Sequence, residues 1–158
     1  MGNPNTTISD LMRPAVLVDT STTLFEALSK MIQERRNSLV VVSQDGTVAG
    51  AVNAVDIIME VLPDYLEEDR VAAHFADTSL LKEDALRVKE RSVESFMAKR
   101  VATVTPESSL IEAAVLATKQ GRGRIIVVDE KNKPLGVLTR TEIKHVIAGF
   151  LDIPGIET

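Results

Sequence analysis

The 158-residue sequence contains no cysteine and no tryptophan, and only 3% of its residues are aromatic. Without cysteine, the chain can form neither disulfide bonds nor thiolate metal sites. No apolar run reaches the roughly 18 residues that a membrane-spanning helix requires. The N-terminus also lacks a basic segment followed by an apolar one, so it does not read as a secretory signal. These absences predict a cytoplasmic protein with no membrane partner.

Positive charge is also in short supply. The chain has 18 Lys and Arg residues against 23 Asp and Glu residues, for a formal net charge of −5. A general nucleic-acid-binding protein needs a basic face that displaces counterions, so we expect no nucleic-acid partner. The first sixty residues are the poorer in cations, and any anion-binding site should therefore involve the second half. That half includes Lys89, Arg91, Lys99, Arg100, Lys119, Arg122 and Arg124, which could form a local basic patch.

Residues that could carry catalysis or bind a metal are few and scattered. His74 and His145 are far apart in sequence and have no ligand-like neighbours at useful spacing. The adjacent acids Glu67 and Glu68 lie in a charged segment and are expected to be solvated. Residues 121–124 lack the Lys-Ser/Thr of a phosphate-binding loop and precede a strand. We find no nucleophile beside a base, and therefore predict no catalytic residue, no metal site and no resident cofactor. An enzyme is kept as the last alternative.

The sequence does contain an internal repeat. A shift of 86 residues pairs Leu24 with Leu110 and Gly50 with Gly136, and the matches keep their order over the whole unit. Upstream, Met12 pairs with Met97 after an adjustment of one residue. Further pairs are Val18 with Val104, Glu26-Ala27 with Glu112-Ala113, Arg36 with Arg122, Val41-Val42 with Val127-Val128, and Ile57 with Ile143.

Each copy predicts the same order of elements. A helical turn precedes a brief strand, a helix with apolar residues at helical spacing, two strands and a final helix. The first copy places these at 8–12, 16–18, 24–34, 39–42, around Gly50 and from Asn53 onward. The second copy places them at 93–97, 101–104, from Leu110 onward, 125–128, around Gly136 and from Thr139 onward.

We therefore predict an α/β (α+β) fold of two pseudo-symmetric β-α-β-β-α repeats, residues 8–62 and 92–149. One repeat of about sixty residues buries little surface alone, so we expect the two to pack through their sheets. Residues 63–91 are predicted to form a helical connector. Residues 1–7 and 150–158 are tails.

These segments resemble the tandem CBS domains, named after cystathionine β-synthase, which pair into a Bateman module. In the first copy the resemblance is carried by Leu-Met-Arg-Pro, Leu-Val-Val-Val with Asp-Gly, and Gly-Ala-Val-Asn-Ala-Val-Asp-Ile. In the second it is carried by Phe-Met-Ala-Lys, Arg-Ile-Ile-Val-Val-Asp and Gly-Val-Leu-Thr-Arg-Thr-Glu-Ile. The resemblance implies a regulatory module that binds AMP, ADP, ATP or S-adenosylmethionine between its repeats. It also implies a homodimer that controls an effector protein on a separate chain.

The family's nucleotide motif is Gly-x-x-Thr/Ser-x-x-Asp, at the turn from the third strand into the final helix. Its carboxylate can accept hydrogen bonds from both ribose hydroxyls, and the helix N-terminus favours an anion nearby. The first copy carries Gly50, Asn53 and Asp56 at these positions, and Asn, like Thr, can cap a helix. The resemblance implies that residues of the second copy complete this cleft: Arg100, Val101, Thr103 and, against phosphate, Arg124.

The second copy implies a weaker cleft around Gly136, Thr139 and Glu142, with Val16 from the first copy. Glu142 stands where the motif has Asp, and its extra methylene would push a ribose outward. The position equivalent to Arg124 in the first copy is Ser38, so this cleft lacks the phosphate-binding Arg. The two departures from the motif, Asn53 in the first copy and Glu142 in the second, favour the alternative of a docking or dimerisation module without a nucleotide. Asp56 together with Arg124 favours the nucleotide-sensing module.

Overall fold

The structure, a computed structural model, describes residues 2–64, 69–119 and 124–155. It divides into two compact units, each with its own core. Unit 1 consists of Met1–Ala15, Gly46–Val48 and Arg100–Thr158, and unit 2 of Val16–Asp45 and Ala49–Lys99. Each repeat contributes a three-stranded sheet and two principal helices, so the predicted α/β fold is confirmed. The expected packing of sheet on sheet stays a prediction.

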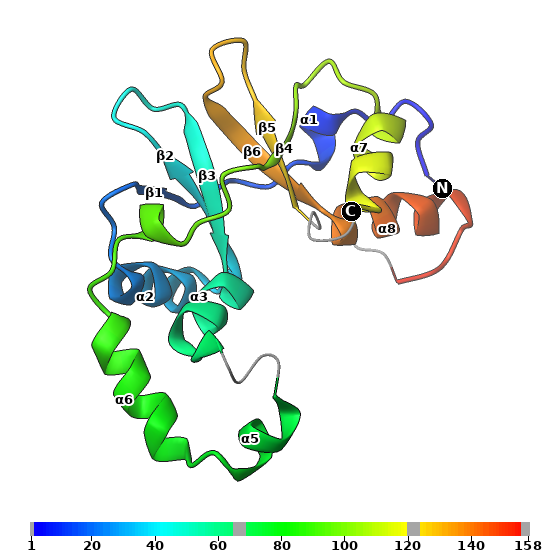
Figure 1. The fold of residues 1–158 in the computed structure, drawn as a ribbon. Coiled ribbons are helices and arrows are strands. Elements are labelled where there is room, and N and C mark those ends of the chain that lie inside the picture. The colour runs from blue at the N-terminus through cyan, green and yellow to red at the C-terminus, as the bar shows by residue number, and fades with distance from the viewer. Residues whose placement is uncertain (1, 65–68, 120–123, 156–158) are drawn as a thin grey trace. The chain divides into compact units, whose positions relative to one another are not determined.

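The sheet of the first repeat has the order β1-β2-β3 (Figure 1). Its strands are β1 (Leu17–Asp19), β2 (Ser38–Val42) and β3 (Val48–Asn53). Strand β1 is parallel to β2, so the chain between them must cross over, and helix α2 (Leu24–Glu34) makes that crossover. Helix α3 (Ala54–Val61) follows β3 directly. The observed order β1-α2-β2-β3-α3 is the one predicted.

The sheet of the second repeat has the order β4-β5-β6 and lies in unit 1. Its strands are β4 (Ala102–Val104), β5 (Arg124–Val128) and β6 (Pro134–Thr139). Strand β4 runs parallel to β5 and β5 antiparallel to β6. Helix α7 (Leu110–Ala117) makes the crossover and α8 (Arg140–Phe150) follows β6 (Figure 1). The second repeat therefore reproduces the element order of the first.

The segments that lead into the two repeats are exchanged, which the sequence did not indicate. We call residues 7–13 and 92–98 the lead-in segments. The first contains α1 (Ile8–Leu11), but Ile8 is buried in the core of the second repeat. The other contains the 3-10 turn η1 (Val93–Ser95), and Val93 is buried in the core of the first repeat. Each unit is thus completed by the segment that precedes the other repeat in the sequence.

The two cores consist of aliphatic side chains from strands and helices. In unit 2, helix α2 buries Leu24, Ala27 and Met31 against the sheet, whereas Leu28 and Ile32 face outward. The unit 2 core is Leu24, Ala27, Met31, Leu39, Val41, Val52, Ile57, Val61, Val88 and Val93. The unit 1 core is Ile8, Ala102, Val104, Ala113, Ala117, Ile125, Val127, Leu138 and Ile143.

The described part of the connector forms helices α5 (Arg70–Phe75) and α6 (Thr78–Val88). Helix α6 contacts α3 and places Val88 in the unit 2 core. The acids Glu67 and Glu68 lie outside the described residues, as do Gly121, Arg122 and Gly123. Among the helices that the structure describes, none has the length and apolar character needed to cross a membrane.

Candidate ligand site

The turn from β3 into α3 brings Gly50, Asn53 and Asp56 together in unit 2. A Cβ atom at Gly50 would lie 2.5 Å from the carbonyl oxygen of Ala98 and 2.9 Å from Sδ of Met97. Glycine is therefore required here because the lead-in segment lies directly against β3.

Asp56 occupies the third position of α3 and forms a reciprocal capping box with Asn53. Its Oδ2 accepts a hydrogen bond from the Asn53 backbone N–H at 2.8 Å, and Asn53 Oδ1 accepts one from the Asp56 N–H at 2.9 Å. Asn53 thus performs the capping role of the motif's hydroxyl residue. The sequence predicted that Asn53 can cap this helix, and the structure confirms it.

The carboxylate of Asp56 is half-buried and only partly satisfied. Burial raises the pKa of the Asp56 carboxyl, and the hydrogen bond from the Asn53 backbone opposes that rise. Its Oδ1 has no hydrogen-bond partner, and the group has no ion-pair partner, among the residues that the structure describes. A half-buried carboxylate with an unoccupied oxygen is suited to accept hydrogen bonds from a ligand.

The equivalent turn in unit 1, from β6 into α8, brings Gly136, Thr139 and Glu142 together. A Cβ atom at Gly136 would lie 2.7 Å from the carbonyl oxygen of Arg13, which repeats the close approach at Gly50. Glu142 Oε2 accepts hydrogen bonds from the Thr139 N–H at 2.7 Å and the Thr139 hydroxyl at 2.5 Å. The second repeat therefore builds the same capping box with a longer acid.

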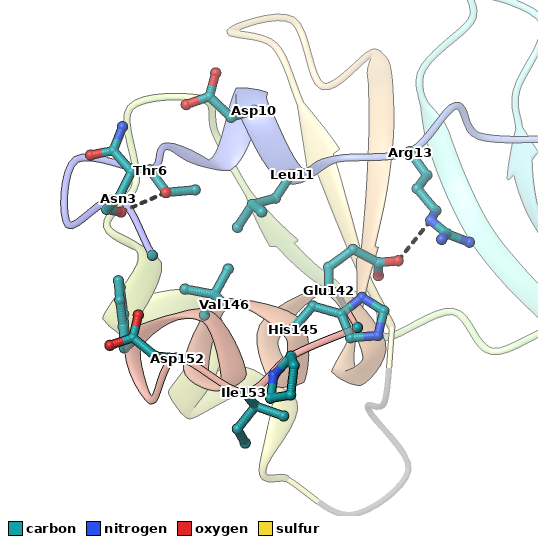
Figure 2. A pocket seen from close by; sticks show the side chains of 15 residues that line it. Asn3, Thr6, Asp10, Leu11, Arg13, Glu142, His145, Val146, Asp152 and Ile153 are labelled. Atoms are coloured by element: carbon teal, nitrogen blue, oxygen red, sulfur yellow. Dashed lines mark hydrogen bonds and ion pairs between the residues drawn. The ribbon is translucent and has the colours of Figure 1, made fainter. Parts of the chain in front are cut away.

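Glu142 differs from Asp56 in being buried and paired. Its residue exposure is 6%, and its Oε1 lies 2.8 Å from Nε of Arg13, which reaches it from the lead-in segment (Figure 2). The two atoms form an ion pair whose alignment does not meet hydrogen-bond geometry, since Oε1 has no hydrogen-bond partner in the described residues. Both oxygens of Glu142 are thus engaged by groups of unit 1.

Arg13 and Ala98 occupy equivalent positions in the two units. Arg13 exchanges backbone hydrogen bonds with Val137 of β6, with both N···O distances at 2.9 Å. Ala98 exchanges the same pair with Ala51 of β3, at 2.9 and 3.0 Å. The main-chain pairing is therefore the same at both turns, whereas the lead-in residue is Arg13 in unit 1 and Ala98 in unit 2.

Unit 1 also contains a cavity of about 670 Å³ between α8, the N-terminal segment and residues 152–155. Leu11, Val146 and Ile153 are among the apolar residues that line it, and Arg13 and Glu142 lie at one edge (Figure 2). The volume falls within the range of small-molecule sites. Sequence reasoning did not anticipate this cavity, because it depends on the exchanged lead-in segment.

The remaining predicted site residues are divided between the units. Arg100, Val101 and Thr103 belong to unit 1, where Arg100 and Thr103 are exposed. Arg124 opens β5 in the same unit and is in register with Thr139 of β6. Val16 belongs to unit 2, where its carbonyl accepts a hydrogen bond from the Val40 N–H at 2.9 Å. That the unit 1 residues complete the Asp56 cleft, and Val16 the Glu142 cleft, stays a prediction.

The two histidines lie on different elements. His74 is on α5 with its ring 5.0 Å from that of Phe75, and His145 is exposed on α8 at the cavity. Within the described residues, no three His, Asp or Glu side chains gather in a way that could hold a metal ion.

Arg13, which pairs with Glu142 in the structure, was not singled out from the sequence. Arg13 is part of the Leu-Met-Arg-Pro segment, and the alignment of Met12 with Met97 already pairs it with Ala98. The available signal was a charged residue aligned with an alanine in two segments that otherwise match. Its partner could not be inferred, because Glu142 belongs to the other repeat.

Two β-α-β-β-α repeats, each with an acid-capped helix after its third strand, define a paired-repeat module. The family model for the CBS domain matches residues 8–63 and 93–149, which is well over half of the chain. The chain belongs to the CBS domain family, as the sequence predicted.

Several curated proteins are related to the chain at low identity. A CBS domain-containing protein of Dictyostelium discoideum is 25% identical over 136 residues, which cover 85% of this chain and 86% of that protein. A homoserine O-acetyltransferase of Methanocorpusculum labreanum is 31% identical over 135 residues, covering 84% of this chain but 22% of the enzyme. An uncharacterised protein of Methanocaldococcus jannaschii, MJ1232, is 32% identical over 60 residues, which make up 38% of this chain and 20% of that protein. The chain thus spans about a fifth of the length of some relatives that it matches.

Solved structures share the fold. The CBS-pair protein CBSX2 of Arabidopsis thaliana has a TM-score of 0.69 at 24% identity, covering 93% of this chain and 95% of that one. CBSX2 has also been solved in complex with AMP, at a TM-score of 0.66 and 24% identity, covering 94% of this chain and 98% of that one. The CBS domain pair of protein MJ0100, in complex with 5′-methylthioadenosine and S-adenosyl-L-methionine, has a TM-score of 0.70 at 20% identity, covering 93% of this chain and 99% of that one.

Proposed function

We propose that this chain is a regulatory module that binds an adenine nucleotide or adenosyl compound at Asp56 and transmits binding to a partner protein. The observation that carries the proposal is the half-buried Asp56 carboxylate, with one oxygen committed to Asn53 and the other without a described partner. The proposed role is binding and not catalysis, and we place it in the cytoplasm, as the sequence analysis does.

The chemistry of the ligand follows from the carboxylate. A ribose offers two adjacent hydroxyl donors, and a carboxylate oxygen held in a partly buried site accepts such hydrogen bonds strongly. The N-terminus of α3 would also favour an anionic group close by. Structural relatives that hold AMP, 5′-methylthioadenosine and S-adenosyl-L-methionine support an adenosyl ligand for this chain as well.

We further propose that residues of unit 1 contribute the rest of the site. Arg100 and Arg124 would pair with phosphate, and Val101 and Thr103 would contact the nucleoside. A nucleotide such as AMP, ADP or ATP would need those arginines, whereas S-adenosylmethionine carries no phosphate. Substituting Arg124 by Gln should therefore weaken AMP more than S-adenosylmethionine.

The test is a thermal-shift panel of AMP, ADP, ATP and S-adenosylmethionine. A ligand present at a hundredfold its Kd should raise the Tm by about 5–10 °C for a chain of this size. Asp56→Asn should remove the shift, because the amide keeps an acceptor for the Asn53 N–H but loses the charge. Glu26→Gln is the matched control, since Glu26 closes the same type of capping box on α2. If no compound shifts the Tm at millimolar concentration, ligand binding is refuted. The alternative of a docking or dimerisation module without a nucleotide then remains.

We also propose that the partners include a second copy of this chain, bound through an apolar face of unit 2. Helix α2 exposes Phe25 and Ile32, at 63% and 70%, and the adjacent α3 exposes Val55, Ile58 and Met59. A face of this kind is typical of a protein–protein contact. The equivalent positions on α8 are polar and include Thr141, Lys144 and His145.

Light scattering after size-exclusion chromatography tests the dimer. Ile58→Glu should convert a dimer into a monomer, because it places a charge in the apolar face. Lys144→Glu, at the equivalent position of α8, should leave the dimer intact. A monomeric parent chain, or equal loss in both variants, would contradict a dimer through unit 2.

A further inference from the structure

The two lead-in segments occupy the same position against their sheets. Each makes a two-way backbone bridge with the third strand, at Arg13 with Val137 and at Ala98 with Ala51. Each also requires a glycine opposite it, as the Cβ distances of 2.5 Å at Gly50 and 2.7 Å at Gly136 show. The side chain of residue 13 is therefore placed relative to α8, which follows β6, as the side chain of residue 98 is placed relative to α3, which follows β3.

The side chains at these positions have opposite consequences for the acid on the helix. Arg13 reaches Glu142, with Nε 2.8 Å from Oε1, and its own side chain is 56% exposed whereas that of Glu142 is 7% exposed. The arginine thus covers a buried carboxylate (Figure 2). Ala98 ends at Cβ and has nothing with which to reach Asp56.

A ligand would meet different costs at the two acids. At Glu142, a ribose hydroxyl would have to displace a guanidinium from a buried carboxylate whose other oxygen already accepts two hydrogen bonds from Thr139. Removing the cation from a buried carboxylate is costly, because the buried charge loses its compensation. At Asp56, no cation of the described residues has to be displaced.

We infer that Arg13 is the residue that closes the α8 site, so that the chain binds one adenosyl ligand at Asp56 and holds a second, closed site at Glu142. This inference rests on the proposed function. It assigns the closure of the α8 site to the Arg13 side chain, whereas the change from Asp to Glu is a separate difference between the two sites.

The experiment counts bound ligands by native mass spectrometry of the full chain, with AMP and 5′-methylthioadenosine as probes. The second probe carries no phosphate, so a change in its binding cannot come from attraction of an anion to a new arginine. The parent chain should bind one molecule. Arg13→Met, which keeps the apolar stem and the backbone bridge, should bind two. Arg13→Lys keeps a cation beside Glu142 and should still bind one.

The reciprocal variant, Ala98→Arg, should close the open site. Ala98 is exposed, so the longer side chain can be accommodated and the variant should fold. An arginine paired with Asp56 should weaken 5′-methylthioadenosine by roughly tenfold or more, the equivalent of one hydrogen bond to a charged group. This variant also tests the inference if Arg13→Met proves too unstable to measure.

The outcomes separate the inference from the proposed function. If the parent chain binds neither probe, the proposed function fails. If the parent chain binds one molecule, but Arg13→Met gains none and Ala98→Arg loses none, the function stands and the role of Arg13 is refuted. The double variant Arg13→Met/Glu142→Gln should return to one molecule, because the amide cannot replace the charged acceptor. A second molecule in the double variant would also refute the inference, since Glu142 would not be the group uncovered.

Discussion

The two units have the same main-chain plan and differ in how they use one acid. In unit 2, Asp56 is half-buried and has no cation beside it among the described residues, and in unit 1 Glu142 is buried beneath Arg13. Both acids retain the capping hydrogen bond to the helix start, with Asn53 and Thr139. The shared backbone thus keeps the capping role in both units, whereas the lead-in residue at the equivalent position is Arg13 in unit 1 and Ala98 in unit 2.

The largest effect that this comparison predicts is an equal loss of stability when either core is disrupted. Leu39 and Ile125 are equivalent residues on the central strands, with exposures of 1% and 0%. Each substitution by alanine should lower the free energy of unfolding by about 2–5 kcal/mol, from lost burial and the cavity left behind. Urea denaturation of both variants measures this. A large effect in one variant and none in the other would contradict equal contributions from the two cores.

The glycine pair should give the next largest effect. Gly50→Ala and Gly136→Ala each place a methyl group against a backbone carbonyl of the lead-in segment, at 2.5 and 2.7 Å. Each should cost about 1–3 kcal/mol, because a backbone contact cannot relax as a flexible side chain can. Gly46→Ala is not a suitable control, since its φ of 82° adds backbone strain. Urea denaturation compares the pair, and a neutral Gly50→Ala would refute close packing of the lead-in segment in unit 2.

The Arg13–Glu142 ion pair should matter less to stability. Arg13→Met should lower the free energy of unfolding by about 1–2 kcal/mol, below the cost of breaking a fully buried pair because Arg13 is largely exposed. Ala98→Met, at the equivalent position, should have little effect. The double variant Arg13→Met/Glu142→Gln should recover most of the loss. If Arg13→Met and Ala98→Met are equally stable relative to the parent, the ion pair contributes nothing.

The smallest predicted effect concerns how stability depends on pH. The sign of this dependence should be opposite for Asp56 and Asp10, the acids of two capping boxes. Burial raises the pKa of Asp56 above its ordinary value of 3.8, so the folded state loses stability as pH rises from that value through the higher folded pKa. The backbone hydrogen bond at Thr7 lowers the pKa of Asp10, so the stability that Asp10 contributes above 3.8 is lost as pH falls through the lower folded pKa.

The variants should therefore diverge between acid and neutral pH. From pH 3 to pH 7, Asp56→Asn should gain in Tm relative to the parent chain, whereas Asp10→Asn should lose. The Asp56 difference should stay below about 1 kcal/mol, because the half-buried group still faces water and caps a helix. Thermal denaturation at several pH values measures both. The same sign in both variants would contradict the assigned environments.

The elements could be predicted from the sequence because their signals are local. The helix at 24–34 was predicted with the bounds observed for α2, since capping residues and apolar spacing lie within the segment itself. The exposure of Leu28 and Ile32 was not predicted, because it depends on what α2 contacts. The resemblance to the CBS nucleotide motif pointed to Asp56 and Glu142. The pairing of Arg13 with Glu142 was not predicted, because it joins one repeat to the lead-in segment of the other.

The exchange of lead-in segments has a consequence for how such a fold can arise. A lone repeat would leave a gap at the place that Ile8 or Val93 fills, and would leave its third strand without the bridge that Val137 and Ala51 make. Two separate copies could repair each other by domain swapping, at a rate and extent set by their concentration. When the two copies are joined in tandem, the exchange of lead-in segments becomes intramolecular and no longer depends on protein concentration.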